Sequence, residues 1–206
     1  MTDKRKAHWD TVYDQKSEMQ LSWHQEEAQL SLELAKLAGI SATSSAIDIG
    51  GGTSRFAGTL LDLGLRDVTV LDLSQVALDA ARQRLGQAGD AVTWVAADIT
   101  TWSPDRQYDF WHDRAVFHFL VDAEDRAAYL NNLTKGLVVG GHAMIATFAP
   151  DGPETCSGLP VARYSPEGLA EVLGERFALV AQRHHLHQTP WGKPQSFQFS
   201  LFRKDH

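Results

Sequence analysis

The feature that most constrains the fold is a short apolar segment that runs into three consecutive glycines. Residues 46–49 read Ala-Ile-Asp-Ile, and Gly50, Gly51 and Gly52 follow directly. Because glycine has no Cβ, such a turn lets a ligand lie against the main chain, beside the exposed amides of the helix expected next. The segment therefore predicts a strand, a turn and a helix that bind a molecule with an adenosine or phosphate part.

Length and composition favour one soluble α/β domain. The chain has 206 residues, 43% of them hydrophobic and 22% charged, which suits one buried core and is too short for two such domains with a linker. No apolar run approaches the roughly 18 to 20 residues of a membrane-spanning helix. The charged N-terminus is not followed by the apolar region of a secretory signal. We therefore expect a single cytoplasmic domain over residues 1–206, with no membrane partner.

Charge and cysteine content argue against several partners. Because 19 Lys and Arg stand against 26 Asp and Glu, the net charge is −7, which repels a nucleic-acid backbone. The single cysteine, Cys156, excludes an intramolecular disulfide and a multi-cysteine zinc site. In the run His184-His185-x-His187, only His185 and His187 share a strand face and no nearby acid completes a ligand set. We therefore expect neither nucleic acid nor a metal, and surface histidines in this run.

After residue 46, candidate strands alternate with amphipathic segments, which predicts a mostly parallel sheet covered by helices. The expected strands are Ala46–Gly50, Val68–Asp72, Val92–Ala97, Tyr108–Asp113, His142–Phe148, Phe177–His185 and Ser196–Arg203. The expected helices are 4–15, 25–38, Arg55–Leu63, Gln75–Leu85, Ala123–Lys135 and Pro166–Gly174. Ser74 and Ser165 are the expected N-caps of two of them. Because a short loop joins the last two strands, they should form an antiparallel hairpin.

Polar residues stand at the carboxyl ends of the expected strands, which is where doubly wound sheets bind ligands. The carboxylate of Asp72, after the second strand, can accept hydrogen bonds from two ribose hydroxyls. Asp98, after the third strand, suits an adenine amino group, with Ile99 as an apolar contact for the ring. The fourth strand ends at Asp113, near the place where a reactive group would protrude.

Together these residues resemble the class I S-adenosylmethionine-dependent methyltransferases, from about residue 46 to the C-terminus. The resemblance implies an α/β, Rossmann-like sheet of seven strands with the last antiparallel (46–206), preceded by N-terminal lid helices (1–45). It implies S-adenosylmethionine as cofactor rather than a dinucleotide, whose Gly-x-Gly-x-x-Gly spacing fails because Gly58 is out of register. The implied cofactor contacts are Gly50, Gly52, Ser54, Asp72, Leu73, Asp98, Ile99 and the backbone of Asp113.

The segment Trp9-Asp10-x-x-Tyr13 is similar to the opening of many small methyltransferases, in which it belongs to a helix over the cofactor. Trp9 and Tyr13 are therefore candidate cofactor contacts, although positions i and i+4 of a helix also share a face for ordinary packing. Arg55, at the start of the helix after the glycines, could pair with the methionine carboxylate or lie exposed.

Methyl transfer is an in-line displacement, so the site has to align a nucleophile and exclude water. His118 and Asp113 are the catalytic candidates, with His118 as a general base because its pKa lies near neutrality. The alternative for His118 is a hydrogen-bonded packing residue between Phe117 and Phe119. Phe117 either lines the substrate pocket or fills the core.

Two further substrate candidates lie outside the strands. Arg114 could hold an anionic substrate or form an ion pair with Asp113, and the ion pair is the favoured interpretation. Trp23 lies on the connection between the N-terminal helices, where it could close over the substrate or simply pack.

The segment 147–165 after the fifth strand predicts a shaped functional loop, because loops of this length seldom lack a role. Cys156 could contact a soft acceptor such as a thiol, or be a buried inert thiol. Arg163 and Tyr164 are candidate anchors for an anionic group.

We therefore expect a methyltransferase that acts on a small molecule, as a monomer or homodimer. A protein-lysine methyltransferase is the alternative, since Trp-Asp-x-x-Tyr also opens such enzymes. Those enzymes tend to carry an Asp-Lys-Gly-type run where this chain reads Asp113-Arg114-Ala115. A third hypothesis is a protein that binds the cofactor without turnover.

Overall fold

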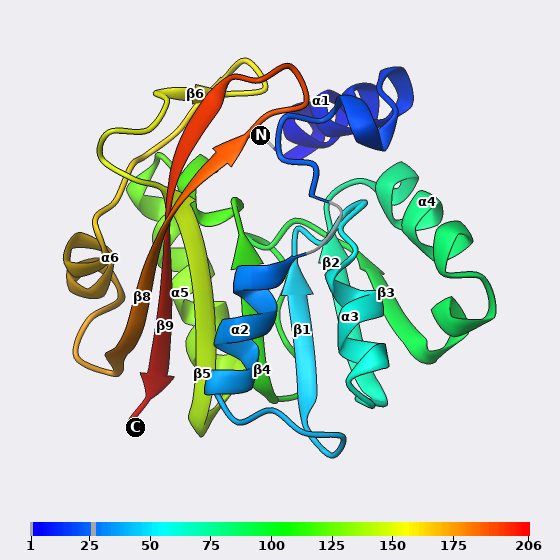
Figure 1. The fold of residues 1–206 in the computed structure, drawn as a ribbon. Helices are drawn as coiled ribbons and strands as arrows, with labels where there is room; N and C mark the ends of the chain where they lie inside the picture. The colour runs from blue at the N-terminus through cyan, green and yellow to red at the C-terminus, as the bar shows by residue number, and fades with distance from the viewer. Residues whose placement is uncertain (1, 26–27) are drawn as a thin grey trace.

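A seven-stranded sheet forms the centre of the computed structural model, which describes residues 2–25 and 28–206. The strand order is β3-β2-β1-β4-β5-β9-β8 (Figure 1). The strands are β1 Ser45–Ile49, β2 Asp67–Asp72, β3 Val92–Ala96, β4 Tyr108–Arg114, β5 Leu137–Phe148, β8 Phe177–Gln188 and β9 Pro194–Lys204. β9 runs antiparallel to both β5 and β8, whereas the pairs among β1 to β5 are parallel. The predicted sheet with a reversed last strand is confirmed.

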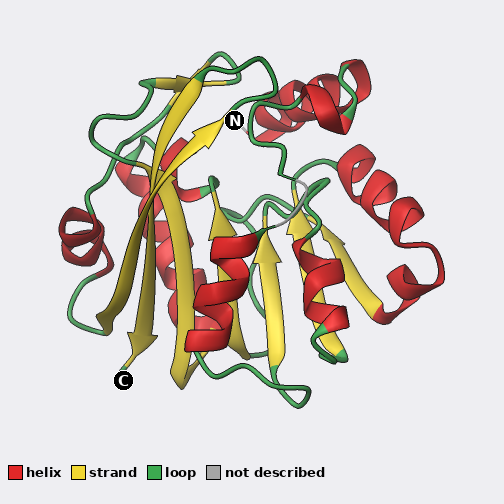
Figure 2. Cartoon of the chain, viewed as in Figure 1, coloured by secondary structure: helices red, strands yellow, loops and turns green. Residues whose placement is uncertain are grey.

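Helices cover both faces of this sheet (Figure 2). α2 (Gln29–Leu37), α3 (Phe56–Asp62) and α4 (Gln75–Leu85) pack on one face, and α5 (Ala123–Gly136) and α6 (Pro166–Leu173) on the other. α1 (Thr2–Gln15) lies across the carboxyl ends of the strands. Short 3-10 helices occur at η1 (Glu18–Gln20), η2 (Gly86–Ala91) and η3 (Phe117–Phe119).

The two N-terminal helices differ in what they cover. α2 belongs to the core, because Leu34 and Ala35 are fully buried against the sheet. α1 is tied down largely by polar contacts: Arg5 pairs with Asp125 at 3.0 Å. Of the two expected lid helices, only α1 therefore lies over the carboxyl edge of the sheet. The predicted start of the second helix at residue 25 precedes the observed start at Gln29, and residues 26–27 lie outside the described residues.

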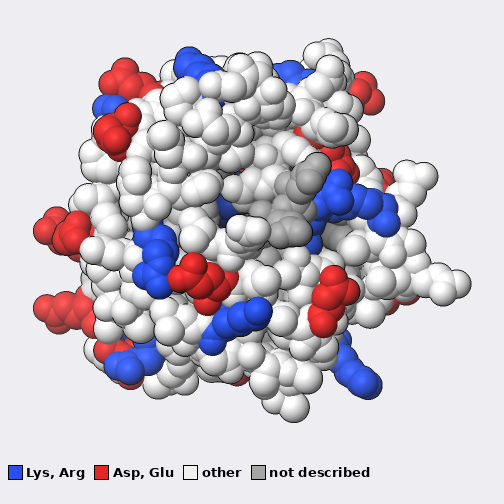
Figure 3. Space-filling model, viewed as in Figure 1, with Lys and Arg blue, Asp and Glu red and all other residues white. Residues whose placement is uncertain are grey.

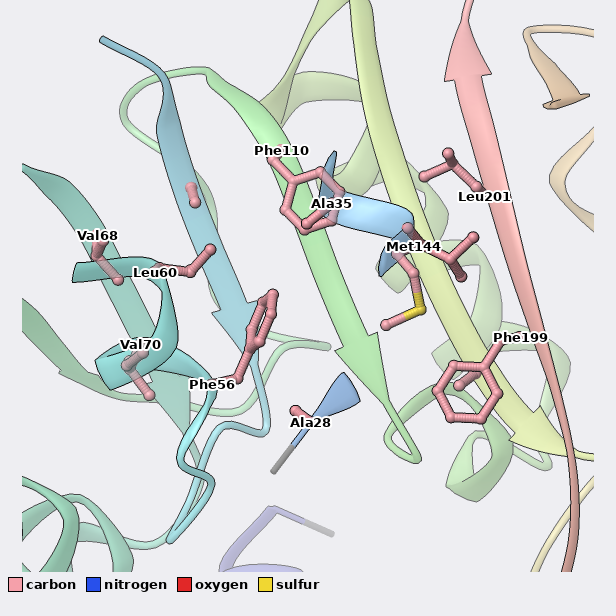
Figure 4. Packing of buried hydrophobic residues seen from close by; sticks show 14 of the residues in the cluster. Ala28, Ala35, Phe56, Leu60, Val68, Val70, Phe110, Met144, Phe199 and Leu201 are labelled. Atoms are coloured by element: carbon pink, nitrogen blue, oxygen red, sulfur yellow. The ribbon is translucent and has the colours of Figure 1, made fainter. Parts of the chain in front are cut away.

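The core between α2, α3 and the sheet is packed with aromatic and aliphatic side chains (Figure 4). Phe56 of α3 and Phe110 of β4 have ring centroids 6.5 Å apart, and Leu60 and Met144 belong to the same cluster. Each such side chain contributes about 1.5–3 kcal/mol when removed from water. This packing fixes the strand ends relative to the loop after β1.

Local signals in the sequence mark two helix starts correctly. Ser74 accepts a hydrogen bond from the Ala77 N–H at the start of α4. Ser165 accepts one from the Gly168 N–H at 3.0 Å, with Pro166 at the first position of α6. Both predicted N-caps are confirmed.

Several element boundaries differ from the predictions, among them the start of β5 and the segment 147–165. β5 begins at Leu137 rather than His142, because Leu137 pairs with Tyr108 beyond an irregularity in the β4 register. The segment 147–165 contains a two-stranded ribbon, β6 (Thr155–Cys156) with β7 (Leu159–Pro160). Strands of two residues carry no alternation that a sequence pattern could reveal.

The surface view in Figure 3 shows Lys and Arg interspersed with Asp and Glu rather than gathered into one basic patch on that face. Across the described residues, none of the helices combines the length and the apolar composition that crossing a bilayer would require.

Candidate active site

One pocket beneath α1 collects most of the predicted site residues. It offers about 1050 Å³ of space, open solvent at its mouth included. The predicted residues that line it are Trp9, Tyr13, Trp23, Gly50, Ser54, Asp72, Leu73, Asp98, Ile99, Arg114 and Cys156. Those that do not line it are Gly52, Arg55, Asp113, Phe117, His118, Arg163 and Tyr164.

The glycine loop forms one wall of the pocket. Gly50 and Gly52 have φ angles of +64° and +44°, a left-handed backbone that side-chain-bearing residues adopt at a cost. A Cβ on Gly50 would collide with the Val116 side chain, and one on Gly52 would lie 2.7 Å from Tyr13 Oη. The close approach at Gly52 is therefore to the side chains of Tyr13 and Asp72, and Gly52 itself does not line the pocket.

Asp72 and Asp98 lie at the ends of neighbouring strands and both face the pocket. Asp72 accepts a hydrogen bond from the Ser74 N–H over 2.8 Å, and burial raises its pKa to about 7. Asp98 Oδ1 accepts hydrogen bonds from the N–H and the hydroxyl of Thr100. Its buried Oδ2 lies 3.6 Å from Arg5 and has no hydrogen-bond partner among the described residues.

A buried polar oxygen without a partner costs roughly 1–3 kcal/mol. Asp98 has such an oxygen, and with the carboxylate of Asp72 on the adjacent strand end it fits a ligand that brings hydroxyl and amino donors. The residues present therefore fit the nucleoside part of S-adenosylmethionine.

A buried hydrogen-bond chain that was not predicted lies beside the glycine loop. His112 Nδ1 is 2.6 Å from Asp48 Oδ1, and His112 Nε2 is 2.9 Å from Ser31 Oγ of α2. The His112 ring stacks on Phe56 with the ring centroids 4.0 Å apart. Asp48 and His112 line the pocket, and Asp48 Oδ2 is buried without a hydrogen-bond partner among the described residues. Asp48 thus offers a ligand a further acceptor.

Aromatic side chains cover the pocket. Trp9 of α1 packs edge-on against Trp23 and Phe119, with ring centroids 5.8 and 5.1 Å apart. Tyr13 packs edge-on against Trp23 at 6.2 Å. These rings line the pocket together.

The two candidate arginines occupy different surroundings. Arg114 lines the pocket, and its Nη2 donates to the carbonyl of Trp23 over 2.9 Å. The predicted ion pair between Arg114 and Asp113 is wrong, because neighbouring residues of a strand point to opposite faces of the sheet. Arg55 lies 3.9 Å from Glu18 with 45% of its side chain exposed, outside this pocket. Arg55 is therefore not placed to hold a methionine carboxylate there.

Both catalytic candidates point away from the pocket. Asp113 accepts hydrogen bonds from the Val116 N–H at 2.8 Å and the Tyr129 hydroxyl at 2.7 Å, and burial raises its pKa to about 7. His118 accepts a hydrogen bond at Nδ1 from the Phe148 N–H at 3.3 Å, and burial lowers its pKa to about 3. Asp113 holds the turn after β4, and His118 is a neutral packing residue. The structure contradicts both catalytic predictions.

The remaining substrate candidates divide. Cys156 lines the pocket, but burial raises the pKa of its thiol to about 11, so the thiol is neutral at pH 7. Phe117 and Tyr164 pack on each other with centroids 5.6 Å apart, in the core on the α5 face. Arg163 pairs with Glu154 at 3.0 Å within its own loop. These three predicted substrate contacts lie elsewhere.

The histidine run is less exposed than expected. His187 is buried, and its Nε2 donates to the carbonyl of Ser22 over 2.7 Å. His184 Nε2 lies 2.8 Å from Ser196 Oγ. Within the part of the chain that the structure describes, no three His, Cys, Asp or Glu side chains gather as a metal site would require.

β9 supplies two pocket residues that sequence reasoning missed. Gln195 and Phe197 line the pocket close to Cys156. They are alternate residues of one strand and therefore share a face. Only the position of β9 next to β5 could reveal that this face meets the pocket.

Solved structures share this architecture. One comes from a study of the conversion of a disulfide bond into a thioacetal group during echinomycin biosynthesis, with a TM-score of 0.75, 22% identity, and coverage of 100% of this chain and 93% of that chain. A second is the 1,6-didemethyltoxoflavin-N1-methyltransferase of Burkholderia thailandensis, with bound 1,6-didemethyltoxoflavin and S-adenosylhomocysteine. Its TM-score is 0.70 at 22% identity, and the match covers 99% of this chain and 86% of that chain. A third is the N-methyltransferase NodS of Bradyrhizobium japonicum, in complex with S-adenosylhomocysteine. Its TM-score is 0.69 at 23% identity, and the match covers 86% of this chain and 85% of that chain.

The fold is thus that of the class I S-adenosylmethionine-dependent methyltransferases, in which a Rossmann-like sheet ends in one antiparallel strand. Residues 46–141 match the family model of a methyltransferase domain. This stretch, just under half of the chain, is therefore similar to methyltransferase domains. A search of curated protein sequences gave no match.

Proposed function

We propose that this methyltransferase transfers a methyl group from S-adenosylmethionine to a small-molecule nucleophile in the pocket beneath α1. One observation carries the proposal: the carboxylate of Asp72 and the unpaired buried oxygens of Asp48 and Asp98 meet in a single covered pocket. This set of acceptors matches the hydroxyl and amino donors of the cofactor.

Each part of the cofactor has its own proposed contacts. Asp72 accepts hydrogen bonds from the ribose hydroxyls, Asp98 Oδ2 accepts one from the adenine amino group, and Ile99 packs on the ring. Gly50 borders the methionine part. The S-adenosylhomocysteine bound by the enzymes of Burkholderia thailandensis and Bradyrhizobium japonicum on the same fold supports S-adenosylmethionine as the cofactor.

When bound, S-adenosylmethionine supplies a methyl carbon on a positively charged sulfur, so that a lone pair of the acceptor forms the new bond while the carbon–sulfur electron pair stays on sulfur. The residues of the chain align the acceptor and exclude water. Trp9, Trp23 and Phe119 exclude water in this account. His118 takes no proton, because it is buried away from the pocket.

A small acceptor is favoured over a protein lysine because α1 covers the pocket. Arg5 pairs with Asp125, and Ser74 donates to Asp10 over 2.6 Å, so the helix is fixed to the core at two points. A lysine on a folded protein would have to pass this helix. The bound 1,6-didemethyltoxoflavin of the Burkholderia thailandensis enzyme also supports a small acceptor.

The test is label transfer from S-adenosylmethionine labelled on its methyl group, with a pool of small thiols and phenols and, separately, the proteins of a cell lysate. We expect label in the small-molecule pool, and none with Asp72→Ala. Label on protein bands alone would favour the lysine methyltransferase. Binding of S-adenosylhomocysteine without transfer to either pool would favour a protein that only binds the cofactor.

A further inference from the structure

The strand order divides the pocket into two halves. Asp98, Asp72 and Asp48 stand at the ends of β3, β2 and β1, whereas β4, β5 and β9 continue the sheet on the other side (Figure 1). The proposed cofactor contacts occupy the first half. The second half is lined by Arg114, Cys156, Gln195 and Phe197, with Trp23 and Phe119. An acceptor in line with the cofactor has to bind there.

Arg114 brings a positive charge into this second half. A guanidinium has five N–H donors in a planar fork, and the carbonyl of Trp23 takes one of them. Across residues 2–25 and 28–206, no carboxylate lies within ion-pair distance of Arg114, although the charge of Asp48 favours its protonated form. Burial lowers the pKa of the guanidinium, so removal from water already disfavours its charge. The free donors suit an anionic group, which a guanidinium can hold with two parallel hydrogen bonds.

Apart from Asp48, whose charge acts on Arg114 from the end of β1, the groups that line this half of the pocket are uncharged and largely flat. Trp23, Phe119 and Phe197 are aromatic, Gln195 is a neutral amide, and Cys156 is a neutral thiol. Aromatic walls pack best against a flat ring, face to face with an offset or edge to face.

The residues assigned to this half of the pocket include no carboxylate and no histidine that could remove a proton from an acceptor. Both ring nitrogens of His112 are engaged, by Asp48 and by Ser31. An acceptor that binds as an anion needs no such base, and a neighbouring positive charge favours its deprotonated form.

From these observations we infer that the acceptor is a flat aromatic molecule bound as an anion, with its negative group paired to Arg114. This inference rests on the proposed function. The methionine part of the cofactor also carries a carboxylate that could pair with Arg114. The experiment therefore has to distinguish this carboxylate from an anionic acceptor.

The test compares benzoate with benzamide, which share a ring and differ in charge. Each is titrated calorimetrically into protein already loaded with S-adenosylhomocysteine. We expect wild type to bind benzoate at least about tenfold more tightly than benzamide, as one charge-assisted hydrogen bond provides. Arg114→Met should bring the ratio near one, whereas Arg114→Lys should keep a preference for benzoate. Arg203→Met is the matched control, because Arg203 is exposed and pairs only with Asp205 in the described part of the chain.

Equal binding of the two probes to wild type, or binding of neither, overturns the inference without any variant being needed. A second contrary result is a tenfold loss of S-adenosylhomocysteine affinity in Arg114→Met with the benzoate preference unchanged, which would assign Arg114 to the methionine carboxylate. Failure of wild type to bind S-adenosylhomocysteine at all would instead refute the proposed function, and the first titration shows this before a probe is added.

Discussion

The raised pKa of Asp72 predicts how the binding of S-adenosylhomocysteine depends on pH. Burial raises the pKa of this carboxyl to about 7, and ribose hydroxyls donate to its ionised form. Between pH 8 and pH 6 the ionised fraction in the free protein falls from about 0.9 to about 0.1, so S-adenosylhomocysteine should bind about tenfold more weakly at pH 6, or about 1.4 kcal/mol. Binding strengthens as pH rises because the bound ligand favours the deprotonated carboxylate.

Isothermal titration calorimetry at pH 6, 7 and 8 measures this slope. Asp72→Asn is the control, because it keeps the size of the side chain and cannot ionise. At pH 8 this variant should bind about 10- to 100-fold more weakly, since hydrogen bonds to a charged group contribute about 1.5–3 kcal/mol, and its affinity should change little with pH. Asp113, whose pKa is also raised to about 7, lies outside the pocket and remains in the variant. A flat wild-type curve, or the same slope in Asp72→Asn, would refute the reasoning.

Three other residues give predictions that simpler assays can check. His118→Gln should keep the rate of methyl transfer within about threefold of wild type, and a hundredfold loss of rate would restore His118 as a base. Because burial lowers the pKa of His118 from 6.5 to about 3, the Tm of wild type should fall more steeply below pH 6.5 than the Tm of the variant. The Asp113 pKa is raised from 3.8 to about 7, so its contribution to stability is present below pH 4 and is lost as pH rises to 7; the Tm of Asp113→Asn relative to wild type should therefore rise between pH 5 and pH 8, and a constant difference would contradict this. Cys156, with a pKa of about 11, should be about 0.1% thiolate at pH 8 and react with iodoacetamide far more slowly in the folded protein than in urea, whereas equal rates would show that the thiol is not buried.

Most residues in the cofactor half of the pocket could be predicted from the sequence, because the position of a residue at a strand end is enough to place it at the edge of the sheet. Asp72 and Asp98 end neighbouring parallel strands, and the carboxyl ends of such strands meet at one edge of the sheet. The glycine run fixed the place of the turn for the same reason. Asp48 was predictable in principle, since a carboxylate inside an apolar strand needs a partner, and His112 supplies it across the β1–β4 pair.

The residues of the acceptor half could not be predicted in the same way. Their positions depend on turn conformations and on contacts between segments far apart in the sequence. Ala115 has a φ of +74°, an unusual conformation for a residue with a Cβ. The chain turns at this residue, after which Phe117 and His118 are buried in the core rather than exposed to the pocket. Gln195 and Phe197 reach the pocket only because β9 inserts between β5 and β8.

The most direct test of the central claim is a crystal structure of the protein with S-adenosylhomocysteine. We expect the ribose hydroxyls within hydrogen-bond distance of the Asp72 carboxylate and the adenine amino group on Asp98 Oδ2. The sulfur should face the half of the pocket that contains Arg114. A ligand bound outside this pocket, or bound within it with its sugar away from Asp72, would contradict the account.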